Sequence, residues 1–150
     1  MKPEVKINLL GIYLLLILVV LIIIAVVAYF FYSTDQLIRA LIFVGCSGGI
    51  GGTIYSIRGF YQNLGERNFQ LNWSWWYIFR PIISIAIGVF VYFLIAGGLI
   101  SFGLISETDY SKGILFLCGI SFLSGFSFTR VADKFENLSS ILFSKKEKKK

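Results

Sequence analysis

The sequence predicts an all-α membrane protein with four transmembrane helices, an interfacial connection and a C-terminal amphipathic helix. Hydrophobic residues make up 57% of the chain, above the roughly 45–50% of soluble proteins. Four long apolar runs fill most of the 150 residues. If each run crosses a membrane, nearly all basic residues lie on the same side of it. This charge asymmetry is typical of multi-pass membrane proteins.

The four runs are long enough to cross a hydrocarbon core about 30 Å thick. The first, residues 8–32, contains no charge and would reach about 37 Å as a helix. The others cover 37–57, 81–105 and 113–129. No remaining segment is long enough to fold as a soluble domain, so residues 1–129 are predicted to form one transmembrane domain.

The first run is predicted to be an uncleaved span. A signal-peptide core is about 7–15 residues long and ends at a small-x-small site. This run is longer, and Ala25 and Ala28 have the wrong spacing for such a site. Leu, Ile and Val residues lie on all faces of the predicted helix, as is typical of a helix in lipid. The same surface would also suit contact with another protomer.

The second run is rich in small residues, which let helices approach closely in lipid. Glycine weakens a helix, so this many glycines need a reason. Small residues also lie four apart in the third and fourth runs. Three interpretations stay open: packing among these spans, a subunit interface, or a surface that faces a pore or ligand. The candidate helix-packing or pore-facing residues are Gly45, Gly48, Gly49, Gly52, Ser56, Ser84, Gly88, Ser121, Ser124 and Gly125.

The connection between the second and third runs, residues 58–77, holds all three tryptophans. Residues 68–75 alternate polar and apolar, but no partner strand is evident, so we predict a chain lying in the headgroup zone. Gly65 is expected to end a short helix. The segment could serve as an interfacial anchor or bind a lipid or nucleotide headgroup. The interfacial or lipid-contacting candidates are Arg58, Arg67, Trp73, Trp75, Trp76, Tyr77 and Arg80.

Arg80 and Pro81 are predicted to open the third span, because proline is tolerated in the first turn of a helix. From there Arg80 can extend to the interface. Its guanidinium is expected to reach inner-leaflet phosphates or the 58–77 connection. Burial at the bilayer centre would cost about 2.5–3.5 kcal/mol.

The distribution of charge sets the predicted orientation. With four spans, twelve of the fourteen basic residues share one side, whereas three spans would place the basic tail, residues 144–150, outside. Both termini are therefore predicted to be cytoplasmic, in a bacterial inner membrane. The tail adjoins anionic inner-leaflet lipids, which attract basic residues. A net charge of +6 in this position does not indicate nucleic acid.

Residues 130–143 are predicted to form a cytoplasmic amphipathic helix. Val131, Phe135, Leu138 and Leu142 follow a 4-3-4 spacing that places them on one face. Two arrangements stay open. The helix could lie on the inner leaflet or pack between protomers.

No residue pattern in the chain indicates catalysis. There is no histidine, and Cys46 and Cys118 fall inside apolar runs, which makes a zinc site improbable. Small multidrug exporters also have four spans but depend on a glutamate in the first, and this first span has none. We therefore predict a protein that is not an enzyme, without catalytic residues, cofactor or metal.

Five short segments of the chain stand out together. They are Gly48-Gly49-Ile50-Gly51-Gly52, Trp75-Trp76-Tyr77, Arg80-Pro81, Gly97-Gly98 and Asp133-Lys134. The combination resembles a group of small predicted bacterial four-span proteins without an assigned activity. The resemblance covers residues 37–143 and supplies no catalytic residue.

Two hypotheses for function follow from these patterns. The first is a homo-oligomeric membrane protein that could form a channel or pore, because the small-residue faces could meet between protomers or line a lumen. The second is a membrane anchor or scaffold for a cytosolic protein that docks on residues 58–77 and 130–150.

Overall fold

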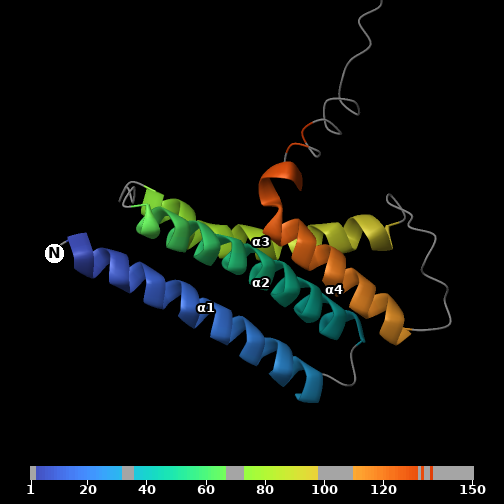
Figure 1. Ribbon diagram of the computed structural model, residues 1–150. Coiled ribbons are helices and arrows are strands. Elements are labelled where there is room, and N and C mark those ends of the chain that lie inside the picture. Colours follow the sequence, from blue (N-terminus) through green and yellow to red (C-terminus); the bar gives the residue numbers. More distant parts are fainter. Residues whose placement is uncertain are drawn as a thin grey trace, which may run out of the picture.

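The computed structural model is helical throughout the part of the chain that it describes (Figure 1). Four helices alternate with short connections. The helices are α1 (Pro3–Phe31), α2 (Gln36–Gly65), α3 (Ser74–Ala96) and α4 (Tyr110–Phe126). The described residues are 3–31, 36–66, 73–97, 110–131, 133 and 136.

Three of these helices, α1, α2 and α3, are long and apolar enough to cross a membrane. The fourth contains a shorter apolar stretch, Gly113–Phe126. An all-helical chain with three candidate spans and one shorter apolar helix agrees with the predicted fold class at this coarser level. By length and composition, the chain is a candidate multi-pass membrane protein.

The helices begin and end at different residues from those predicted. α2 continues past residue 57 to Gly65, and α3 begins at Ser74, so residues 58–65 and 74–77 belong to the two long helices rather than to a separate interfacial connection. Pro81 consequently lies inside α3 instead of opening it. No proline lies between residue 57 and Gly65, and the helix continues through the one glycine there, Gly59.

Some predicted features lie outside the described residues. These include Arg67, residues 98–105 of the third predicted span, and the basic tail 144–150. Of the predicted amphipathic helix, residues 130, 131, 133 and 136 are described, and they are helical.

Neighbouring helices run in alternating directions, with α2 in contact with all three others (Figure 1). Gly11 of α1 faces Phe60 near the end of α2. Gly48 of α2 faces both Ser84 of α3 and Gly125 of α4. Gly49 also faces Leu21 of α1, Gly45 and Gly52 face Val89 and Ser84 of α3, and Ser121 of α4 donates a hydrogen bond to the Val44 carbonyl, so α1 and α3 are antiparallel to α2 and α4 is parallel to it. The start of α1, the end of α2 and the start of α3 therefore share one end of the molecule, and α4 ends beside Gly51, midway along α2.

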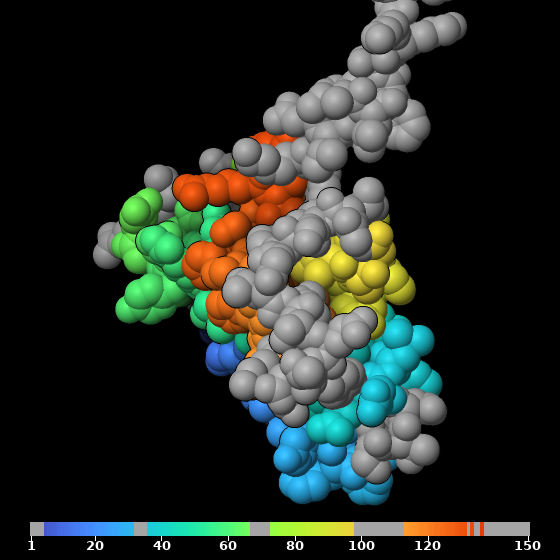
Figure 2. Space-filling view, turned by 90° about the vertical axis from the view of Figure 1, so that its right-hand side faces the viewer, coloured from blue at the N-terminus to red at the C-terminus, as the bar shows by residue number. Residues whose placement is uncertain are grey.

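α1 is the least buried of the three long helices. In its most apolar stretch 17% of residues are buried, against 50% in α2 and 33% in α3. In the space-filling view, α4 (orange) lies on one face with the C-terminal part of α3 (yellow) near it (Figure 2). The arrangement leaves α2 as the helix around which the others pack.

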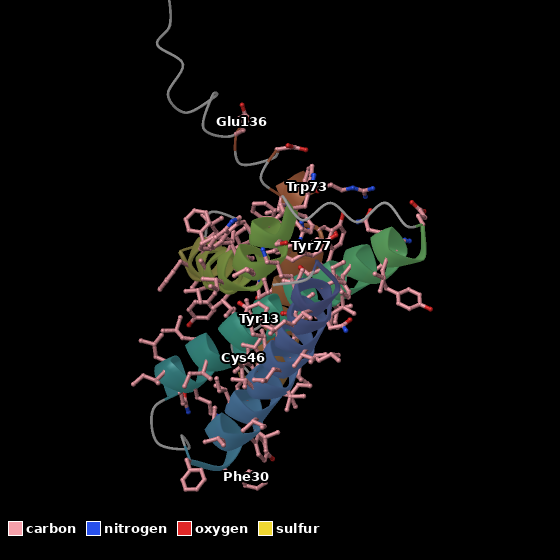
Figure 3. The ribbon with its side chains drawn as sticks, turned by 90° about the vertical axis from the view of Figure 1, so that its left-hand side faces the viewer. Tyr13, Phe30, Cys46, Trp73, Tyr77 and Glu136 are labelled. Carbon is pink, nitrogen blue, oxygen red and sulfur yellow. The ribbon has the colours of Figure 1, made fainter. Side chains whose placement is uncertain are left out.

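α1 is held to the bundle at the end where α3 begins. Leu10 and Leu14 pack with Tyr77 in a buried cluster, and the Tyr13 hydroxyl donates a hydrogen bond of 3.2 Å to the Ile78 carbonyl. Figure 3 shows Trp73 and Tyr77 at the opposite end of the molecule from Phe30 of α1. The aromatic residues at the start of α3, including Trp73 and Tyr77, therefore lie at the end that holds the start of α1.

Loss of the Tyr13 hydroxyl should loosen this attachment modestly. We expect Tyr13→Phe to lower the free energy of unfolding by about 0.5–1.5 kcal/mol, the usual net value of one hydrogen bond. Tyr29→Phe is the control, because Tyr29 lies on the same helix and is 58% exposed. Equal unfolding midpoints for wild type and Tyr13→Phe in a mixed-micelle SDS titration would show that this hydrogen bond does not hold α1.

Candidate functional site

A junction of small residues joins α2, α3 and α4; we call it the small-residue junction. A Cβ atom added at Gly48 would lie 2.6 Å from the Ser84 carbonyl oxygen, 3.0 Å from the Gly88 Cα and 3.0 Å from the Ser121 Oγ. Real Cβ atoms essentially never approach other atoms more closely than 3.0 Å. The three helices therefore meet with their backbones in contact, as small residues permit. The junction comprises Val44, Gly48, Gly51, Gly52, Ser84, Gly88, Ser121 and Gly125.

Serine side chains supply hydrogen bonds between these helices. Ser121 Oγ donates to the Val44 carbonyl at 2.6 Å, and Ser84 Oγ donates to the Gly125 carbonyl at 3.4 Å. Both serines are fully buried. Each hydroxyl thus satisfies its donor on the backbone of another helix, which removes the cost of burying a polar group in an apolar setting.

All ten residues that the sequence suggested for packing or pore lining are buried. Gly45 and Gly49 face α3 through Ile85, and Gly52 faces Ser84. Ser56 and Ser124 donate to carbonyls one turn earlier in their own helices. Among the three interpretations left open by the sequence, these positions favour packing within one chain.

The residues suggested for the interface separate into two groups. Arg58 is exposed, as are Trp73 and Trp75, at 58% and 67%. Trp76 is half-buried, whereas Tyr77 and Arg80 are buried. The structure thus brings together only part of the predicted set, at the first two turns of α3.

Arg80 is 3% exposed and lies among aromatic rings, an arrangement that we call the arginine cage. Its Cζ atom is 3.8 Å from the centroid of the Tyr55 ring, 4.4 Å from that of Trp76 and 5.6 Å from that of Phe128. Tyr55 comes from α2 and Trp76 from α3. The sequence-based expectation was a guanidinium that reaches inner-leaflet phosphates or the 58–77 connection. The guanidinium does contact Trp76 of that connection, and the other rings around it come from α2 and from the segment after α4.

A break at the end of α4 positions Phe128 in the cage. α4 ends at Phe126, Ser127 forms a turn, and residues 128–131 resume a helical conformation. The Ser127 N–H donates to the Leu123 carbonyl at 2.9 Å, and the Val131 N–H donates to the Ser127 carbonyl at 3.1 Å. The backbone therefore stays hydrogen-bonded through the turn while its direction changes (Figure 1).

The guanidinium of Arg80 has no hydrogen-bond acceptor among the described residues. Its Nε, Nη1 and Nη2 atoms are all buried and unpartnered. An arginine stays charged and carries five N–H donors. A buried donor without an acceptor costs about 1–3 kcal/mol, and more when charged, whereas a desolvated cation–π contact contributes about 2 kcal/mol. The rings thus stabilise the positive charge of the guanidinium but give its N–H donors no hydrogen-bond acceptor.

A pocket of about 220 Å³ adjoins the arginine cage. The rings of Trp75 and Phe79 stack in its wall with centroids 5.9 Å apart. Apart from Arg80, the lining side chains are aromatic or aliphatic. The lining residues are Trp75, Trp76, Phe79, Arg80, Ile83 and Phe128.

The sequence reasoning did not identify Tyr55 or Phe128. Trp76 and Arg80 are four residues apart, and residues with this spacing are neighbours on one face of a helix. A helix predicted over both residues would therefore have indicated their contact. No local pattern marks Tyr55 or Phe128, because they reach Arg80 only through the packing of α2 and α4 against α3.

The described residues contain no group of three or more His, Cys, Asp or Glu that could hold a metal ion. Cys46 is buried and Cys118 half-buried, and both are free thiols. Comparison with family models, curated proteins and solved structures finds no match to the chain.

Proposed function

We propose that the chain is a non-enzymatic scaffold of the bacterial inner membrane and that it crosses the bilayer four times. Its residues 58–77 and 130–150 form the surface on which a cytosolic protein docks. The observation that carries this proposal is the small-residue junction. Its glycines and serines pack α2, α3 and α4 against one another at backbone contact. A tightly packed bundle is suited to holding a docking surface at the membrane.

The alternating helix directions support four spans. α4 is parallel to α2, and its 17 residues reach the lower limit for a spanning helix, about 17 residues. Lys6 and Arg58 lie toward the end shared by the start of α1 and the end of α2, Arg130 follows the end of α4, which runs in the same direction as α2, and all three are exposed. By the positive-inside rule this end is cytoplasmic.

Cysteine labelling tests this topology. In a background with Cys46 and Cys118 replaced by serine, a cysteine at Lys148 should react with an impermeant maleimide only after the cells are lysed. A cysteine at Thr108, in the opposite connection, should react in intact cells. Labelling at Lys148 in intact cells would overturn the proposed orientation.

Docking of a partner makes a separate prediction. A soluble protein that co-purifies with the wild type should be lost on deleting residues 130–150, because the basic and amphipathic segments of this region would be removed together. Leu16→Ala is the control, because Leu16 is 58% exposed on α1, away from the proposed docking surface. Retention of the same partner by the deleted protein would contradict docking on this segment.

A conducting homo-oligomer is the second candidate function. The exposed large hydrophobic residues of α1 provide a surface that another protomer could cover, and they include Leu9, Ile12, Leu15, Leu16 and Val19. A lumen between protomers would then lie outside the small-residue junction, which is closed within one chain. We expect no current from the purified protein in planar bilayers, and a reproducible single-channel conductance would favour the pore over the scaffold.

A further inference from the structure

We propose that the arginine cage and its pocket bind the phosphate group of an anionic molecule, with Arg80 as the anion-binding residue. A phosphate group is common to an anionic lipid headgroup and to a free phosphate in solution. The site goes beyond the proposed scaffold function, and it requires neither a particular number of spans nor a protein partner.

The guanidinium contacts aromatic rings, but its N–H groups have no acceptor among the described residues. Rings of Tyr55, Trp76 and Phe128 lie 3.8–5.6 Å from its Cζ atom. The nitrogens have no acceptor among the described residues. A phosphate or carboxylate accepts two parallel hydrogen bonds from such an edge. The unpartnered N–H groups therefore suit an oxyanion.

This chain offers no carboxylate for that role among its described residues. The acidic side chains whose positions are described, Glu66, Asp133 and Glu136, are all exposed. None of these carboxylates therefore forms a buried ion pair with Arg80. An external anion would supply the acceptor, and it would reach the buried nitrogens through a movement of the side chains that line the pocket.

The pocket indicates what kind of molecule carries the anion. Around Arg80 its walls are carbon-rich, formed by Trp75, Phe79 and Ile83 among others. Its volume of about 220 Å³ is below the roughly 300–1,000 Å³ typical of pockets for whole small molecules. The pocket therefore suits a phosphate with its first carbon atoms, while the rest of a larger molecule extends outside.

The position of the site suits a headgroup at the membrane surface. Arg80 lies six residues after the first residue of α3, which corresponds to about 9 Å along the helix. Trp73 and Trp75, at the same end, are exposed, and tryptophan is enriched at the membrane–water interface. A phosphate at interface depth would be within reach of this arginine.

The tryptophans provide a direct probe, because all three in the chain lie at this end of α3 and two of them line the pocket. Full-length protein is reconstituted in phosphatidylcholine nanodiscs. One arm adds increasing fractions of phosphatidic acid, and the other adds inorganic phosphate to discs of phosphatidylcholine alone. Tryptophan emission and the thermal unfolding midpoint are followed in both arms.

Four variants separate the site from general charge. Arg80→Gln removes the charge, and Arg80→Lys keeps the charge without the planar fork. Ile83→Phe fills the pocket without changing Arg80. Arg58→Gln removes the same charge from an exposed position one turn beyond Tyr55 on α2.

We expect a saturable emission change in the wild type. Arg80→Gln should raise the half-saturating phosphate or lipid concentration about ten- to hundredfold, as expected for the loss of charge-assisted hydrogen bonds. Arg80→Lys should raise this concentration about tenfold, because lysine lacks the bidentate geometry. Ile83→Phe should also raise it, and Arg58→Gln should leave it unchanged.

The two arms identify the source of the phosphate. A response to phosphatidic acid alone supports a lipid headgroup, and a response to inorganic phosphate supports a soluble ligand. If Arg80→Gln does not fold, the comparison of Ile83→Phe with Arg58→Gln decides. Absence of a saturable response to both probes in the wild type, or equal weakening by Arg58→Gln and the site variants, would overturn the proposal.

Discussion

Replacing Gly125 with alanine is expected to lower the free energy of unfolding by about 3 kcal/mol, the upper part of the usual range for overpacking. The added Cβ would collide with the Gly48 carbonyl oxygen and lie 2.8 Å from the Gly48 carbonyl carbon and 3.1 Å from its Cα. All three are backbone atoms, so no side-chain rotation relieves the collision. The helices α2 and α4 would have to separate, and the Ser84 hydrogen bond to Gly125 would be strained with them.

Gly119→Ala is the matched control on the same helix. A Cβ at Gly119 meets no atom within 4 Å. Alanine is favoured over glycine in a helix interior by about 0.5–1 kcal/mol, so this variant should be neutral or slightly more stable. Equal SDS-unfolding midpoints for the two variants would show that α2 and α4 are not in backbone contact. A large loss with Gly119→Ala would indicate that another chain covers this part of α4.

The helices and their small faces were predictable, but their pairing was not. Apolar runs and the four-residue spacing of glycine and serine are visible in the sequence, because both follow from the period of a helix. Gly48 could have faced α3, α4 or another protomer. Its contact with both Ser84 and Gly125 depends on how three helices pack at once, which the local pattern does not encode.

The ends of the helices show a different limit. Gly65 was predicted to end a short helix, and the helix that ends there is α2, which is 30 residues long. Trp73, Trp75 and Trp76 were expected in a connection that lies in the headgroup zone, because tryptophan prefers the interface. Ser74–Ala96 is helical instead. Interfacial preference concerns depth in the membrane and does not decide between a helix and an extended chain.

The predicted position of the Arg80 side chain depended on the free-energy cost of burying a charge in lipid. That cost is real, but aromatic rings offer a partial alternative to water. Only Trp76 is close to Arg80 in the sequence. The other two rings come from α2 and from the segment after α4, so their contribution appears only when the helices are assembled.

The ring of Tyr55 should carry much of the stabilisation of Arg80. We expect Tyr55→Leu to lower the free energy of unfolding by about 2 kcal/mol, the value of a desolvated cation–π contact. Leucine keeps an apolar side chain beside Phe126, whose ring centroid is 5.5 Å from that of Tyr55. The larger part of the loss should therefore come from the guanidinium, which would lose its nearest ring.

A double-mutant cycle with Arg80→Met separates these terms. Because Arg80 has no acceptor among the described residues, Arg80→Met alone should leave lipid-free stability unchanged or raise it, as when a buried charge is replaced by an apolar residue. In that background Tyr55→Leu should cost less, giving a coupling of about 1–2 kcal/mol. The control cycle uses Tyr29 and Arg39. The Arg39 Cζ atom is 5.3 Å from the centroid of the Tyr29 ring, and Tyr29 is exposed. The coupling energy of this pair should therefore stay within about 0.5–1 kcal/mol. If Tyr55→Leu costs the same with arginine or methionine at position 80, the Tyr55 ring does not stabilise the charge.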